Sequence, residues 1–156
     1  VWELDAKYAG LTRKEKLELV RGKMAELGAD VFVIPALDEV AWLLNLRGGD
    51  VLLLDGEMGA GKTVFTKGIA LALGINAEIT SPTYAYLNDY DGKLYHYDCY
   101  RLSSGEDAEA LGLTEYFYGN GVCVVEWSEN IADVLPDNCK RVKIEKIDLN
   151  TRKITY

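Results

Sequence analysis

The sequence predicts an α/β fold in which a mainly parallel central sheet carries helices on both faces and a β-hairpin. Short apolar runs suited to buried parallel strands alternate with segments of helical composition. One such run, residues 50–54, leads through a glycine-rich loop into a helical segment, residues 63–73. A chain of 156 residues is the size of one domain, which on folding buries roughly 70% of its unfolded surface.

The glycine-rich loop, residues 56–63, matches the phosphate-binding pattern G-x-x-x-x-G-K-[ST] in full. Its glycines let main-chain N–H groups turn toward an anion, and the following helix adds its positive end. Lys62 is expected to reach the β and γ phosphates and the Thr63 hydroxyl to bind Mg²⁺. A plain glycine-rich turn is the alternative, but a chance match is on the order of one in a hundred at average glycine usage. The residues of the loop expected to bind the nucleotide are Glu57, Met58, Gly59, Ala60, Gly61, Lys62 and Thr63.

Periodicity and turn residues divide the rest of the chain into elements. A capping box, Thr12 with Glu15, begins a helix that ends at Gly28. The dipeptide Asp91-Gly92 is typical of a two-residue hairpin turn. The further elements expected are a strand over 30–34, a helix over 37–46, hairpin strands over 84–90 and 93–100, a helix over 106–117 interrupted at Gly112, a strand over 121–127, a short helix over 130–135, and a strand pair over 141–147 and 153–156.

Composition excludes several functional classes. The net charge of −8 is the opposite of the basic face with which proteins usually bind nucleic acid by themselves. His96 is the only histidine, which argues against multi-histidine metal sites. The three cysteines lack C-x-x-C spacing, which argues against a zinc site and a disulfide framework. No apolar stretch approaches ~20 residues and the first residues do not look like a signal peptide, so no membrane contact and a cytoplasmic location are expected.

A triphosphate-cleaving site also needs carboxylates for the cation and the attacking water. Glu126 ends an apolar strand, and in doubly wound sheets that position lies beside the phosphate loop. A surface carboxylate at a strand end is the alternative for Glu126. From pattern alone, Asp98 is more typical of a polar hairpin residue than of a catalytic one. Thr83 fits either a γ-phosphate sensor or an ordinary threonine at a strand start.

Residues 49–127 resemble the TsaE family, the bacterial ATPases of tRNA threonylcarbamoyladenosine synthesis. The resemblance rests on residues 49–63, on Thr80-Ser81-Pro82-Thr83, on residues 94–102 and on Glu126-Trp127, in that order and spacing. It implies that the Ser-Pro-Thr segment is a nucleotide-sensing switch and that Asp98 and Glu126 serve the metal and the water. On this resemblance the expected catalytic residues are Asp98, Glu126 and Lys62, the metal residues are Thr63, Glu126 and Asp98, and Thr83 and Trp127 join the nucleotide-binding set.

The front of the chain departs from that family. Residues 1–48 resemble the N-terminal domain of aminopeptidase P-type peptidases, on residues 7–10, 23–30 and 36–48. The metal-binding catalytic domain of those peptidases has no counterpart here, so the resemblance implies shape and ancestry rather than peptidase activity. A fusion with its joint near Gly48-Gly49 is the simplest account. We divide the chain into an N-terminal extension, residues 1–29, and a P-loop ATPase domain, residues 30–156.

The expected function is Mg²⁺-dependent ATP binding and slow hydrolysis in threonylcarbamoyladenosine modification of tRNA. The resemblance implies TsaB and TsaD as partners, with the tRNA contacted only through TsaD, which suits the charge of −8. A small-molecule kinase is one alternative, although such enzymes use several arginines and Arg101 is the only one between Arg47 and Arg141. A non-hydrolysing, nucleotide-gated binding module is the other, and the sequence alone does not separate it from a slow ATPase.

Overall fold

The computed structural model describes residues 11–26, 28, 46 and 48–156. The strand expected over 30–34 and nearly all of the helix expected over 37–46 lie outside the described residues. The described elements are, in chain order, helix α2 (Arg13–Glu26), strand β1 (Val51–Asp55), helix α4 (Lys62–Ala72), strands β2 (Leu87–Tyr90) and β3 (Leu94–Asp98), helix α5 (Gly105–Ala110), 3₁₀ helix η1 (Leu113–Tyr118), strand β4 (Val122–Glu126), 3₁₀ helix η2 (Ser128–Val134), and strands β5 (Lys140–Lys146) and β6 (Arg152–Thr155).

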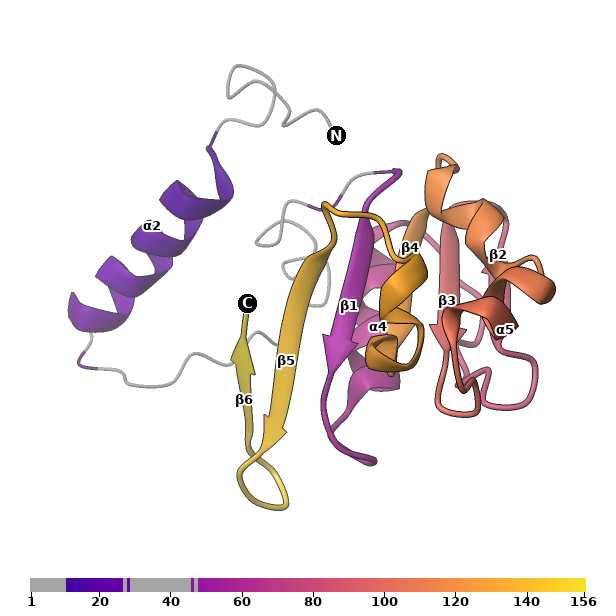
Figure 1. Ribbon diagram of the computed structural model, residues 1–156. Coiled ribbons are helices and arrows are strands. Elements are labelled where there is room, and N and C mark those ends of the chain that lie inside the picture. Colours follow the sequence, from indigo (N-terminus) through magenta and orange to yellow (C-terminus); the bar gives the residue numbers. More distant parts are fainter. Residues whose placement is uncertain (1–10, 27, 29–45, 47) are drawn as a thin grey trace.

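Six strands form one sheet in the order β2-β3-β4-β1-β5-β6 (Figure 1). The three inner pairings, β3 with β4, β4 with β1 and β1 with β5, are parallel. The edge strands β2 and β6 run antiparallel to their neighbours, each as one arm of a hairpin. The mainly parallel sheet with a β-hairpin is therefore confirmed, as is the predicted pairing of the last two strands.

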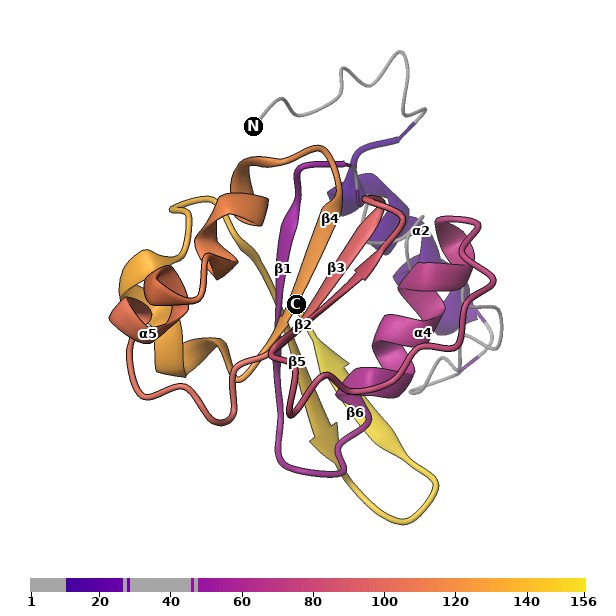
Figure 2. The ribbon, with the colours of Figure 1, turned by 90° about the vertical axis from the view of Figure 1, so that its right-hand side faces the viewer.

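Helices cover both faces of the sheet, as the sequence predicts. Figure 2 shows the sheet nearly edge-on, with α4 on one side and α5 with the 3₁₀ helices on the other. Leu52 and Leu54 of β1 face the buried cluster that includes Ile69 of α4. Val51 and Leu53, which alternate with them, face the cluster that includes Phe117 of η1. A central strand buried on both faces explains the unbroken apolar run that the sequence shows there.

The predicted capping box of the first helix is present. The Thr12 hydroxyl accepts a hydrogen bond from the main-chain N–H of Glu15 at 3.2 Å, and the Glu15 carboxylate accepts one from the main-chain N–H of Thr12 at 2.7 Å. These reciprocal bonds satisfy two donors that a helix start would otherwise leave unpaired. Within the described part of the chain, no helix is long and apolar enough to cross a membrane.

Local turn geometry moves some predicted boundaries. The strand expected from residue 84 begins at Leu87, because the main-chain N–H groups of Ala85 and Tyr86 both bond the carbonyl of Pro82 and Tyr86 has φ 64°. The break expected at Gly112 is confirmed, with φ 70°, and the segment after it is the 3₁₀ helix η1 rather than a continuing α-helix. The short helix expected over 130–135 is also 3₁₀, and it begins at Ser128.

Candidate functional site

The carboxyl ends of three neighbouring strands, β1, β4 and β3, bring the predicted site residues together. In the parallel register, Glu126 of β4 lies opposite Leu54 of β1 on one side and opposite Asp98 of β3 on the other. The phosphate loop leaves β1 at this same end, and α4 begins within it at Lys62. The carboxyl ends of parallel strands are where doubly wound sheets bind their ligands.

The loop depends on glycine and on the C-terminal hairpin. Gly56, Gly59 and Gly61 all have positive φ. A Cβ on Gly56 would lie 2.6 Å from the carbonyl oxygen of Ile144 in β5, so the main chain passes there too closely for any side chain. On the other side of the loop, Arg152 of β6 donates through Nε to the carbonyl of Ala60 at 2.8 Å. The β5–β6 hairpin therefore supports the loop at two points.

Lys62 lies folded into the loop that precedes it. Its ammonium donates to the carbonyl oxygens of Gly56 at 2.6 Å and Glu57 at 3.2 Å, and it lies 4.0 Å from the centroid of the Trp127 ring. Burial lowers the pKa of Lys62 below its ordinary value, and the carboxylate of Glu126 is the largest opposing influence. The ammonium is thus held beside the loop, where a bound phosphate would find it.

Thr63 and Glu126 meet directly. The Thr63 hydroxyl donates to Oε1 of Glu126 at 3.1 Å, and this oxygen also lies 2.8 Å from Nε2 of His96. A hydroxyl and a carboxylate are the oxygen ligands that Mg²⁺ prefers, and it usually takes its remaining ligands from phosphates and water. In the part of the chain that the structure describes, no group of three or more acidic, histidine or cysteine side chains could hold a metal ion. The donor set therefore fits Mg²⁺.

Asp98 binds the predicted switch segment. Its Oδ2 accepts hydrogen bonds from the hydroxyls of Ser81 at 2.8 Å and Thr83 at 2.6 Å. Its Oδ1 accepts one from the main-chain N–H of Tyr100 at 3.1 Å. The structure therefore brings Thr83 and Asp98 together, next to Glu126. In this arrangement Asp98 holds residues 81–83, and the expected roles of Asp98 in metal binding and catalysis stay predictions.

Trp127 packs against the Lys62 ammonium at the end of β4. It follows β4 with φ 59° and ψ 42°, a left-handed conformation that is uncommon for a large side chain. Its ring contacts Tyr100, with centroids 5.0 Å apart, as well as the Lys62 ammonium. Asn130 supports the neighbouring turn by donating to the carbonyl of Cys99 at 3.0 Å. The structure thus places Trp127 against the phosphate loop, where the sequence predicts a nucleotide contact.

Two residues of this arrangement have no role in the sequence-based interpretation. His96 contacts Glu126, and Arg152 contacts the loop carbonyl of Ala60. The position of His96 two residues before Asp98 on a strand was the available signal, since alternate residues point to the same face. For Arg152 no comparable signal exists, because the contact depends on how the last hairpin folds back onto the loop.

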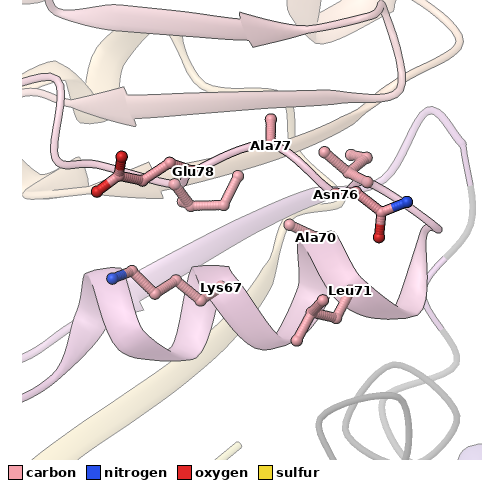
Figure 3. Close-up of a pocket in the computed structure, with 8 residues that line it drawn as sticks. Lys67, Ala70, Leu71, Asn76, Ala77 and Glu78 are labelled. Atoms are coloured by element: carbon pink, nitrogen blue, oxygen red, sulfur yellow. The ribbon is translucent and has the colours of Figure 1, made fainter.

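The hollow in Figure 3 is separate from this site. It lies between α4 and the segment that follows it, and Figure 3 shows Lys67 and Leu71 on the helix, with Asn76 and Glu78 on the segment that runs beside it. No residue predicted to bind nucleotide or metal lines it. We therefore place the functional site at the phosphate loop and not in this hollow.

The sheet, the loop after β1 and the helix that follows define a P-loop NTPase-like α/β domain. The chain belongs to the TsaE family: the family model described as threonylcarbamoyl adenosine biosynthesis protein TsaE matches residues 36–154. Two proteins named tRNA threonylcarbamoyladenosine biosynthesis protein TsaE are 47% identical to it. The one from Treponema pallidum aligns over 112 residues, 70% of this chain and 83% of that protein. The one from Bacillus subtilis aligns over 113 residues, 70% of each.

The crystal structure of YdiB from Bacillus subtilis has the same fold, with a TM-score of 0.61, 33% identity, and coverage of 92% of this chain and 78% of that one. At the front of the chain, residues 1–54 match the model of the creatinase/prolidase N-terminal domain. This confirms the resemblance to peptidase N-terminal domains. The two family matches overlap at residues 36–54, and the joint predicted near Gly48-Gly49 falls within that overlap.

Proposed function

We propose that this chain binds ATP with Mg²⁺ at residues 56–63 and hydrolyses it slowly, in support of threonylcarbamoyladenosine modification of tRNA. The observation that carries the proposal is the convergence of Lys62, Thr63 and Glu126 at the end of the phosphate loop. The names of its relatives supply the pathway. TsaB and TsaD are the proposed partners, with tRNA bound through TsaD, and the net charge of −8 supports that indirect role.

Each side chain has a distinct task in this proposal. Lys62 exchanges its loop carbonyls for phosphate oxygens and neutralises charge that develops during cleavage. Thr63 and Glu126 hold the Mg²⁺, which when bound would neutralise phosphate charge and orient the triphosphate. Asp98 anchors Ser81 and Thr83, so that the segment carrying Thr83 has a defined position beside the γ phosphate.

Two other functions compete with this one. A small-molecule kinase usually clamps its acceptor and the transferring phosphoryl group with arginines. Here Arg101 instead lies over the Tyr84 ring, 4.3 Å from its centroid, which gives that alternative no support. A nucleotide-gated binding module that does not hydrolyse ATP would use the same loop, and it differs only in what Asp98 and Glu126 do.

The deciding experiment measures ATP affinity by calorimetry and single-turnover phosphate release, with and without TsaB and TsaD. Glu126→Gln and Asp98→Asn keep the shape of each side chain and delete its charge. For an ATPase we expect Glu126→Gln to slow cleavage by at least ~10²-fold and to weaken Mg²⁺-dependent binding by less, because the carboxylate acts mainly in the transition state.

Two results would change this assignment. Unchanged phosphate release in both variants would favour the nucleotide-gated binding module. An equal loss of affinity and rate would instead limit the two carboxylates to ground-state metal binding, with no added role in the transition state.

A further inference from the structure

His96 is a buried polar residue that the proposed phosphate chemistry does not use. It lies in the middle of β3, opposite Val124 of β4, and none of its surface is exposed. It points to the same face of the sheet as Asp98, because the two are separated by one strand period. Neither phosphate binding nor the anchoring of residues 81–83 requires an imidazole there.

The two ring nitrogens of His96 have different surroundings. Nε2 lies 2.8 Å from Oε1 of Glu126. Nδ1 is buried and has no hydrogen-bond partner among the described residues. A proton on Nδ1 would leave a buried N–H unsatisfied, which typically costs about 1–3 kcal/mol. The arrangement therefore places the proton of this hydrogen bond on Nε2, which donates to Oε1 of Glu126.

The same carboxylate oxygen receives two hydrogen bonds. Oε1 of Glu126 accepts from Nε2 of His96 and from the hydroxyl of Thr63. Donors on two different elements, β3 and α4, fix the carboxylate in one orientation. Within the described residues Oε2 accepts no hydrogen bond, so this second oxygen is the one left for a cation or its water.

We propose that His96 is a positioning residue for Glu126: it holds the carboxylate so that Oε2 faces the Mg²⁺ site. This inference rests on the proposed function, since it concerns the same metal. Partners that orient a metal-binding carboxylate typically contribute 10–100-fold to metal affinity. His96 itself touches neither the metal nor the nucleotide. Its effect passes entirely through the orientation of Glu126.

A matched pair of variants tests this role. His96→Gln keeps an N–H donor that reaches Glu126, whereas His96→Met has a similar length and no donor. The binding of a non-hydrolysable ATP analogue is measured by calorimetry in Mg²⁺ and again in EDTA. We expect His96→Met to reduce the gain in nucleotide affinity that Mg²⁺ gives by about tenfold, and to leave the nucleotide affinity measured in EDTA unchanged. We expect His96→Gln to keep most of that gain.

The outcomes separate this inference from the proposed function. If the unmodified chain binds no nucleotide, or gains nothing from Mg²⁺, the proposed function fails and the role of His96 fails with it. If the unmodified chain shows the gain and His96→Met keeps all of it, only the role of His96 is overturned. If both variants lose the Mg²⁺-dependent gain equally, or if nucleotide affinity in EDTA falls as well, His96 is a packing residue.

A measurement on the unmodified chain covers the case in which the variants do not fold. His96 is the only histidine, so its ring signals in nitrogen-15 NMR need no assignment once any affinity tag is removed. We expect a proton on Nε2. A ring with no proton on Nε2 would contradict the hydrogen bond that carries the inference.

Discussion

At the scale of single residues, Lys62 and Thr63 divide the proposed phosphate chemistry between a charge and a hydroxyl. Lys62 is nearly buried, and its ammonium bonds carbonyls of its own loop. Thr63 is half-buried, and its hydroxyl bonds Glu126 instead of the loop. In the proposed function the two neighbours therefore serve different parts of a bound nucleotide, the phosphates and the cation.

Lys62→Ala and Thr63→Ala are expected to fail in different ways. Without Lys62 the loop loses its fixed positive charge, so we expect nucleotide binding itself to be lost. Without the Thr63 hydroxyl we expect binding to persist and its dependence on Mg²⁺ to disappear. Loss of one such preorganised group typically lowers the cleavage rate by ~10²–10³-fold. Calorimetric titration with ATP measures both effects, and wild-type affinity and rate in both variants would remove the loop from the mechanism.

At the scale of elements, the loop and β5 constrain one another through Gly56. The carbonyl of Ile144 occupies the space that a Cβ on Gly56 would need, at 2.6 Å. Gly59, three residues later, also has a positive φ, of 76°, but a Cβ there would meet nothing within 4 Å. Gly59 therefore provides a comparison at which a positive φ is present without a close main-chain contact.

Gly56→Ala is therefore expected to destabilise the protein more than Gly59→Ala. Both variants must hold an alanine at a positive φ, 156° at residue 56 and 76° at residue 59, which L side chains rarely adopt. Gly56→Ala must in addition displace main chain of β5, and each further 1 kcal/mol lowers Tm by about 2–4 °C in a domain of this size. Thermal unfolding followed by circular dichroism measures the difference, and equal Tm values would contradict the close approach.

The elements also show which features are readable from sequence. The strands β1 and β4 follow from apolar runs, and the hairpin follows from Asp91-Gly92, because both signals are local. The left-handed turns at Tyr86 and Trp127 carry no local signal, since neither is a residue type that favours positive φ. They arise from contacts made after folding, and they set where β2 begins and how Trp127 faces the loop.

The residues of the site can likewise be separated into those that the sequence predicts and those whose roles depend on contacts in the fold. The motif gives Lys62 and Thr63 directly, and Glu126 follows from its place at a strand end. The pairing of His96 with Glu126 joins residues 30 positions apart and depends on the register of β3 with β4, which sequence periodicity does not supply. The binding of Ser81 and Thr83 by Asp98 depends likewise on the turn before β2.

At the scale of the whole molecule, the two buried hydrophobic clusters contain no described residue of α2, although Lys16 of that helix is itself buried. Among the described residues, Leu46, 8% exposed, is the first along the chain in either cluster. The family match also begins later, at residue 36. The predicted division between an extension, residues 1–29, and the ATPase domain, residues 30–156, stays a prediction.

Deletion of residues 1–29 tests that division. We expect the shortened chain to unfold in one cooperative thermal transition and to bind ATP with the affinity of the full chain, because Leu46, the sheet and the loop are all kept. Calorimetry with ATP and Mg²⁺ on both chains compares the affinities directly, and near-ultraviolet circular dichroism reports whether the core is packed. An insoluble product, or one with a broad transition and no near-ultraviolet signal, would show that the first helix completes the core. A packed core with weakened binding would instead assign the extension to the nucleotide site, since the sheet and the loop would then be intact and only the affinity changed.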